Sequence, residues 1–392
     1  MAAGPGHSLH SVPSQGNHLS TQQSDERGIA LKKWSALSLD IVLLAALALA
    51  PLYLSAYHLS LLGRFLALAV LSLGISVIWG WGGILSLGQG VFWGLGAYVL
   101  AMHLKLTGLA PGDIPDFMMW SGLDHLPAWW KIFEHPAVAI AGVVVIPTIA
   151  GGLLAWLVFN RRVSGVYFSL LTQALALAFS TLLISQQAYT GGFNGLTDFS
   201  TILGHPMIDP GFQRNIYWIT LGVLVVASIA CRWLTHTAFG RVLVAIRDGE
   251  SRVRFLGYHP AAYKTIAFAF GAMLAGISGA LYVVHVGVIS PAMVGVIPSI
   301  EMVIAVAVGG RSSLTGVVLG TLLVNFGKDW ISSAMPEMWQ LAMGALFILV
   351  VTALPQGLAG IPGLVEKLVL WSKGKREAKM ADQPAIALVE KD

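Results

Sequence analysis

Polar side chains set into long apolar runs are the groups in this chain that could do chemistry. Ser86 and Gln89 lie in the glycine-rich stretch 82–97, and Glu301 lies in the apolar run 298–309. A polar group at such a depth needs a bonding partner or a water-lined cavity, because hydrocarbon offers it no hydrogen bonds. We expect these three residues to line a polar route through the molecule. The alternative is that they only hydrogen-bond neighbouring helices.

The residues that an enzyme would need are scattered. An intramembrane active site requires acid, base and imidazole groups close together. In the apolar runs these groups are far apart in sequence: Asp40, Glu301, His103 and His285. The single cysteine, Cys231, excludes an internal disulfide, and no G-x-x-x-x-G-K-[S/T] phosphate-binding motif occurs. We therefore expect no enzymatic activity, no cofactor and no metal site.

The elements that must position these side chains are membrane helices. Of the 392 residues, 56% are apolar and 11% are charged, whereas soluble domains carry about 25% charged residues. An apolar run of roughly 20 residues crosses the hydrocarbon as a helix, so the sequence predicts an all-α polytopic membrane protein with about ten transmembrane segments, some broken or re-entrant. The expected segments are 36–57, 60–80, 83–103, 136–159, 165–186, 215–233, 262–285, 298–309, 313–333 and 337–354.

Basic residues are distributed unevenly between alternate loops. If the N-terminus is cytoplasmic, five of the 23 Lys and Arg residues fall outside the inner loops and tails: Lys105, Lys131, Arg214, Lys328 and the in-span Arg64. Since inner loops of membrane proteins carry the excess of basic residues, both chain ends should be cytoplasmic, and the loops 104–135 and 187–214 should face outside. The net charge of +4 then reflects topology and not nucleic-acid binding.

Three regions follow from this pattern. Residues 1–33 are polar and predict a disordered cytoplasmic tail, in which His7 and His10 lack the further ligands that a metal site needs. Residues 34–362 form the transmembrane domain, which includes a cytoplasmic loop at about 234–261. Residues 363–392 form a charged cytoplasmic tail.

Glycine interrupts two apolar stretches in a similar way. Residues 82–90 and 309–316 both read Ser-Leu followed by small residues at the start of an apolar helix, and paired interruptions of this kind point to the central site of a transporter. A third glycine-rich stretch, 190–199, carries Asn194 and Thr197 in an expected outer loop. There they would either serve an entrance or form an ordinary surface turn.

The loop 234–261 mixes basic and acidic residues with spaced apolar ones. This pattern predicts a short pair of amphipathic helices at the membrane face. The length and mixed charge of the loop favour a protein-docking surface over a loop that only fixes topology. The candidate contact residues on that surface are Arg247, Asp248, Glu250, Arg252 and Gly257.

Five motifs spread over roughly residues 60–362 carry a family resemblance. They are 85–98, the loop 240–258 with Tyr263 and Lys264 after it, 275–282, 308–311 and 354–360. Together they resemble the branched-chain amino-acid ABC permease family. The stretches 165–174, 190–199 and 285–291 are most similar to the urea-transporting subgroup of that family, and within it to the larger of two permease subunits.

The resemblance implies a permease subunit of a heteromeric importer in the bacterial inner membrane. Its partners would be a second permease subunit, two ABC ATPase subunits and a periplasmic substrate-binding protein. The segment 248–257 would dock into the ATPase as a coupling helix. The chain departs from the family pattern at Ser312, where Gly is more frequent, and in its longer N-terminal tail.

Urea is the expected cargo. It is neutral and offers both an acceptor and N–H donors, so amide and hydroxyl groups suit it, and the chain supplies Gln89, Gln173, Asn194 and Thr197. We also expect no fixed cation in mid-membrane that could bind the carboxylate of a substrate. Branched-chain amino acids or short amides are the alternative cargo on the same fold. A self-sufficient channel or secondary carrier is a further alternative, which would transport without ATPase partners.

Overall fold

The computed structural model describes residues 40–110, 113–163, 165–199, 201–202, 205–206, 209–353 and 357–360. Both predicted tails, 1–33 and 363–392, and the 354–356 part of the last family-like motif lie outside these residues. The chain divides into two compact units, Met1–Leu52 and Tyr53–Asp392. The first unit holds nearly all of an apolar helix, Asp40–Tyr53, where a segment over 36–57 is predicted.

Helix dominates the described residues, and six helical stretches are long and apolar enough to cross a membrane. They are Ala56–Trp81, Pro136–Asn160, Val166–Ser185, Gly211–His236, Pro260–Val286 and Pro291–Gly309. Two shorter apolar helices are Asp40–Tyr53 and Trp339–Val350. The prediction of an all-α polytopic membrane protein is therefore confirmed.

The second unit contains the following elements in chain order. Its longer helices are α2 (Ala56–Ser76), α3 (Gln89–Thr107), α6 (Pro136–Asn160), α7 (Val166–Ser185), α9 (Pro210–His236), α10 (Ala238–Phe255), α11 (Pro260–Val286), α12 (Val296–Gly309), α13 (Leu314–Ala334) and α14 (Trp339–Ala353). Shorter helical elements are η1 (Val77–Trp81), α4 (Asp116–Trp120), α5 (Ala128–Lys131), η2 (Ile132–Glu134), α8 (Gln187–Thr190), η3 (Gly192–Asn194), η4 (Pro291–Met293) and η5 (Leu358–Gly360). The strands β1 (Thr201–Ile202) and β2 (His205–Pro206) pair antiparallel.

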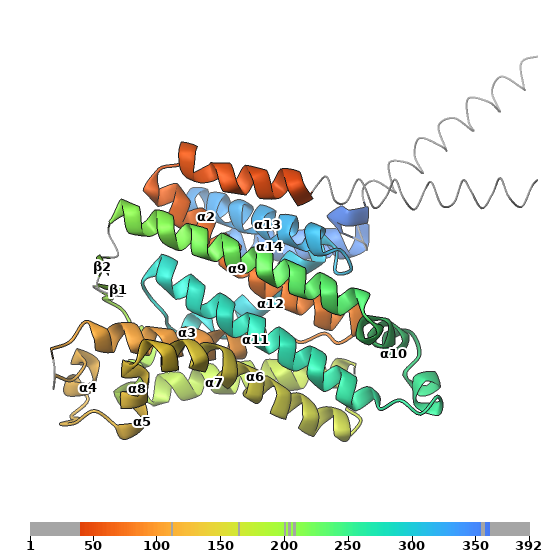
Figure 1. Cartoon of the computed structure of the whole chain (residues 1–392), viewed down its shortest axis with the longest axis horizontal. Helices are drawn as coiled ribbons and strands as arrows, with labels where there is room; N and C mark the ends of the chain where they lie inside the picture. Colours follow the sequence, from red (N-terminus) through yellow and green to blue (C-terminus); the bar gives the residue numbers. More distant parts are fainter. Residues whose placement is uncertain are drawn as a thin grey trace, which may run out of the picture. The chain divides into compact units, whose positions relative to one another are not determined.

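Helix α11 lies at the centre of the second unit and packs against α2, α3 and α6 (Figure 1). Glycines permit the close contact with α3. A Cβ on Gly279 would collide with the backbone of Trp93, and a Cβ on Gly96 would collide with the backbone of Gly276. Small residues at such positions let helix backbones approach each other, and α11 thereby becomes the core helix against which the others are placed.

The third predicted segment begins six residues later than expected. Helix α3 starts at Gln89 and not at Gly83, because residues 82–88 form no helix. Side chains of α7 satisfy the backbone there: Thr172 Oγ1 accepts from Leu87 N at 3.1 Å, and Ser169 Oγ donates to the oxygen of Leu85 at 2.7 Å. These bonds replace the helical ones, so a non-helical break survives between η1 and α3.

The predicted cytoplasmic helix pair is present as α10. Its backbone leaves the helical conformation at Gly249, where φ is −172° and ψ is 74°, so two short helices meet at a kink. Figure 1 shows α10 at one end of the second unit and α4, α5 and α8 at the other. Ile246 and Val253 are buried, while Leu256 is exposed.

Candidate functional site

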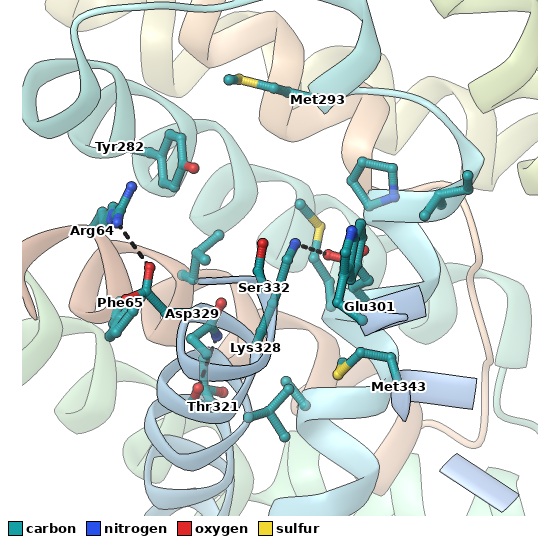
Figure 2. Close-up of a pocket in the computed structure, with 18 of the residues that line it drawn as sticks. Arg64, Phe65, Tyr282, Met293, Glu301, Thr321, Lys328, Asp329, Ser332 and Met343 are labelled. Atoms are coloured by element: carbon teal, nitrogen blue, oxygen red, sulfur yellow. Dashed lines mark hydrogen bonds and ion pairs between the residues drawn. The ribbon is translucent and has the colours of Figure 1, made fainter. Parts of the chain in front are cut away.

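A cavity of about 550 Å³ lies between α2, α12, α13 and α14. Apolar side chains form much of its wall, among them Phe65, Met302 and Met343 (Figure 2). Four ionisable residues also line it, and we call them the cavity cluster: Arg64, Glu301, Lys328 and Asp329.

Two ion pairs hold the cavity cluster together across helices. Arg64 Nη2 on α2 lies 3.3 Å from Asp329 Oδ1 on α13. Lys328 Nζ, one residue earlier on α13, lies 2.5 Å from Glu301 Oε2 on α12 and 4.5 Å from the ring centroid of Trp339. Glu301 is the most enclosed of the four, with 16% of its side chain exposed. A charge in such surroundings depends on its partner, because apolar walls screen it poorly.

Two N–H donors of residues in the cavity wall have no hydrogen-bond partner among the described residues. One is Arg64 Nε, which is buried although the far end of the guanidinium reaches Asp329. The other is Trp93 Nε1, on a ring that packs 5.2 Å from the ring of Tyr282. Both nitrogens are closed off from the cavity space, whereas the Arg64 side chain as a whole is 29% exposed and lines the cavity.

The cavity extends along α2 from Arg64 to Ser72. These residues precede Gly80, where Arg247 of α10 makes contact, by 16 and 8 residues, or about 24 and 12 Å at 1.5 Å per helical residue. Tyr282 lies near the last residue of α11, whereas α11 begins just after α10. The ion pair of Arg64 therefore lies at the end of the cavity that is farther from α10.

The three residues expected along a polar route fall on neighbouring elements. Glu301 lines the cavity. Gln89 is the first residue of α3, one turn before the cavity-lining Trp93; it is 1% exposed, and neither polar atom of its amide has a partner among the described residues. Ser86 is buried in the break before α3, where its Oγ accepts from Gly88 N at 3.5 Å. Neither Ser86 nor Gln89 lines the cavity itself.

Asn194 and Thr197, which are expected in an outer loop, border the cavity instead of lining it. Leu196 pairs with Ile289 through two backbone hydrogen bonds of 2.8 and 3.0 Å, and the next residue, Ser290, lines the cavity. Asn194 and Thr197 flank Leu196 on the same loop, the former exposed and the latter half-buried. Gln173 is half-buried on α7, away from this wall.

Helix α10 carries a second group of charges, which we call the α10 cluster: Arg247, Asp248, Glu250 and Lys264 of the adjacent α11. Arg247 Nη1 donates to the oxygen of Gly80 at 2.6 Å, and its Nε lies 2.9 Å from Asp248 Oδ1. Hydrogen bonding to that guanidinium holds the pKa of the Asp248 carboxyl below its usual value. Lys264 Nζ lies 2.6 Å from Glu250 Oε2. The cluster thus attaches α10 both to the end of η1 and to α11.

The tip of α10 is exposed. Phe255 is 92% exposed and Leu256 is 76% exposed, and both lie between the expected coupling residues Arg252 and Gly257, which are also exposed. Large apolar side chains in this position, next to charged ones, form a surface that a protein partner would cover.

Sequence reasoning missed three members of the cavity cluster. Lys328 was expected to be a basic residue outside the inner loops, and Arg64 was expected to be an isolated charge within a span. Asp329 was not considered. We expected no fixed cation in mid-membrane that could bind the carboxylate of a substrate; Arg64 and Lys328 both line the cavity, each paired with a carboxylate of the chain itself. The available signal was the Lys328-Asp329 dipeptide inside an apolar run, since charges at such depth are rare without function.

Comparisons with known proteins point to one family. Residues 57–351 match the family described as "Branched-chain amino acid transport system / permease component". The chain is 26% identical over 311 residues to the high-affinity branched-chain amino acid transport system permease protein LivM of Escherichia coli, across 74% of this chain and 67% of that protein. It is 29% identical over 222 residues to the autoinducer 2 import system permease protein LsrC of Klebsiella pneumoniae, across 53% of this chain and 60% of that protein. No solved structure matches the chain.

Proposed function

Because the chain belongs to the permease family of branched-chain amino acid transport systems, we propose that it forms half of the translocation pathway of an ATP-driven importer. The chain is a multi-pass membrane permease and a non-catalytic transport subunit. In the proposal, a second permease subunit completes the pathway, two ABC ATPase subunits hydrolyse ATP, and a periplasmic substrate-binding protein delivers the cargo. About ten segments cross the bacterial inner membrane, and both chain ends are cytoplasmic.

The cavity cluster favours an amino acid of the branched-chain type over urea or a short amide. Urea is uncharged, so its recognition does not require four ionisable groups, which are costly at membrane depth. The similarity to LivM adds support, since its name refers to branched-chain amino acids. The observation that carries this proposal is the presence of two ion pairs in one apolar-walled cavity.

Helix α10 supplies the proposed coupling to ATP hydrolysis. Its exposed tip at Phe255 and Leu256 would contact an ATPase subunit, and Arg247 would carry the motion to the oxygen of Gly80. Gly83 follows closely with φ at +68°, and a Cβ there would meet the Arg247 side chain at 2.6 Å. Movement of α10 would therefore shift the break between η1 and α3, and with it Ser86 and Gln89.

The remaining pathway residues are assigned to the route from their positions relative to the cavity. The loop that carries Asn194 and Thr197 is bonded to Ile289 beside the cavity, as an entrance would be. Gln89 and Ser86 would follow Glu301 along the route, one turn from Trp93. Gln173 on α7 would offer a polar contact beyond them.

Uptake into vesicles that hold the complete transporter tests the cargo. We expect ATP-dependent and binding-protein-dependent accumulation of labelled leucine or valine, which a large excess of unlabelled urea does not reduce. Accumulation of urea in place of the amino acids would overturn the cargo proposal. Transport that persists without the ATPase subunits would overturn the importer proposal and favour a channel or secondary carrier.

Labelling of introduced cysteines tests the orientation. Lys131 and Arg252 are both exposed, and we expect an impermeant thiol reagent added to intact cells to label Lys131→Cys and spare Arg252→Cys. The parent chain is the control, because its Cys231 is buried. The reverse labelling pattern would overturn the proposed topology.

A further inference from the structure

We propose that the cavity is a binding site for a zwitterionic amino acid within the permease subunit itself, with the carboxylate held by Arg64 and the ammonium by Glu301. This inference rests on the proposed function and goes beyond it. It places part of the substrate selectivity in the membrane subunit and names the residues that recognise each end of the substrate.

The carboxylate end is assigned from Arg64. Its side chain lines the cavity and is 29% exposed, and it reaches Asp329 through Nη2 at 3.3 Å, a long contact. A carboxylate has two oxygens and can accept from two N–H groups at once, and a guanidinium is the side chain best shaped to donate in that way.

The ammonium end is assigned from the carboxylates that keep acceptor capacity. Glu301 bonds Lys328 through Oε2, and Asp329 bonds Arg64 through Oδ1. Each carboxylate retains a second oxygen, and a carboxylate can accept about four hydrogen bonds in total. Figure 2 shows Arg64 and Asp329 to one side of the cavity and Glu301 to the other, with Lys328 between them. Because Asp329 lies beside Arg64, Glu301 is the acceptor that an ammonium group would find away from Arg64.

Charge balance supports a zwitterion over a singly charged ligand. The cavity cluster contains two cations and two anions, so it is neutral before binding. A zwitterion keeps the filled cavity neutral, whereas an acid or an amine would leave one charge uncompensated among apolar walls, which is unfavourable. Phe65, Met302 and Met343 supply apolar wall for a branched side chain, and about 550 Å³ lies within the range of small-molecule sites.

The competing interpretation is that both ion pairs only fasten α13 to α2 and α12. Binding measurements on the purified complete transporter, in detergent and without the substrate-binding protein, separate the two. We expect saturable binding of leucine by calorimetry. We expect at least tenfold weaker binding of isoamylamine, which lacks the carboxylate, of 4-methylpentanoate, which lacks the ammonium, and of urea.

Variants then assign the two ends. Arg64→Gln should weaken leucine binding at least tenfold and leave the weak binding of isoamylamine unchanged, and Glu301→Gln should weaken isoamylamine binding and leave 4-methylpentanoate unchanged. Arg64→Lys keeps a cation beside Asp329 and loses the paired N–H donors of the guanidinium, so it should assemble and bind leucine several-fold more weakly. Arg232→Gln is the matched control, because Arg232 bonds Thr315 and does not line the cavity; its leucine affinity should equal that of the parent.

The outcomes that overturn the inference are distinct from failure of the proposed function. Equal leucine affinity in the parent, Arg64→Gln and Arg64→Lys proteins would show that the pairs are structural. Leucine uptake by the transporter with no leucine binding to this cavity would also refute the site and leave the importer proposal standing. Absence of uptake for every amino acid tested would refute the proposed function itself.

Discussion

The cavity cluster and the α10 cluster use the same side-chain chemistry in different surroundings. The pairs of the cavity cluster join three separate helices and face a cavity with apolar walls. The α10 cluster pairs neighbours along α10 or joins it to the adjacent α11, and the carboxylate of Asp248 is 63% exposed against 16% for Glu301. Among the described residues of the two clusters, only those of the α10 cluster also bond a backbone oxygen next to a helix break. Arg247 donates to the oxygen of Gly80, just before the break that precedes α3.

The difference suggests how a permease divides its charged residues. Charges in an apolar cavity are costly and sensitive to their partners, so they can discriminate between ligands. Exposed charges add little stability, but they can connect a surface helix to an element that moves. Four variants test this division, from the largest expected effect to the smallest.

The Glu301–Lys328 pair should show the largest effect. Glu301→Gln leaves Lys328 without its anion, and we expect a loss of about 2 kcal/mol in the stability of the complex, below the roughly 3–5 kcal/mol of a fully buried pair because Lys328 is 34% exposed. Adding Lys328→Met should restore at least half of that loss and leave uptake at least tenfold reduced. Thermal melting and uptake of the single and double variants measure both. Full recovery of uptake in the double variant would assign the pair a structural role only.

Gln89 should show the next largest effect on transport. Gln89→Leu removes a buried amide whose polar atoms have no partner among the described residues, so stability should stay equal or rise by about 1 kcal/mol. If the amide serves the route, uptake should nevertheless fall several-fold. Melting and uptake measured on the same preparation separate the two effects. Unchanged uptake with raised stability would place Gln89 outside the route.

Arg247 should affect coupling more than folding. Arg247→Ala removes the bond to the Gly80 oxygen, and we expect substrate-stimulated ATP hydrolysis to fall several-fold while the complex still assembles. Arg241→Ala is the control, since Arg241 lies on the same helix and bonds the oxygen of His236 instead. Comparable loss in both variants would show that the bond from Arg247 to Gly80 has no specific role in coupling.

Asp248 should show the smallest effect. Its side chain is exposed, so Asp248→Asn should leave the melting temperature of the complex nearly unchanged. The pKa of Asp248 is lowered by the hydrogen bond to Arg247, so its contribution is complete above the ordinary aspartate pKa and disappears only as pH falls through the lowered value. Parent and variant should therefore melt alike between about pH 5 and 8, and any difference should decrease in stronger acid. A difference that increases with acid would contradict this assignment.

Local features of the chain were predictable, and long-range ones were not. The helical segments follow from runs of apolar residues, and the kinked helix pair of α10 follows from its amphipathic pattern. The start of α3 at Gln89 does not, because the break before it depends on Ser169 and Thr172 of α7. Glu301 could be singled out as an acid in an apolar run, but its partner Lys328 was expected to be an ordinary outer lysine.

By itself, the sequence determined that this protein is an all-helical membrane protein and, through its motifs, which family it belongs to. Both conclusions depend on composition and on residues close together in sequence, because each apolar run of about 20 residues is by itself long enough to cross a bilayer as a helix. Only the tertiary structure placed Arg64 beside Asp329, 265 residues away along the chain, and enclosed both pairs in one cavity. Such contacts depend on how the helices pack. Helix packing brings together residues that are far apart in sequence, and their separation in sequence does not predict their distance in space.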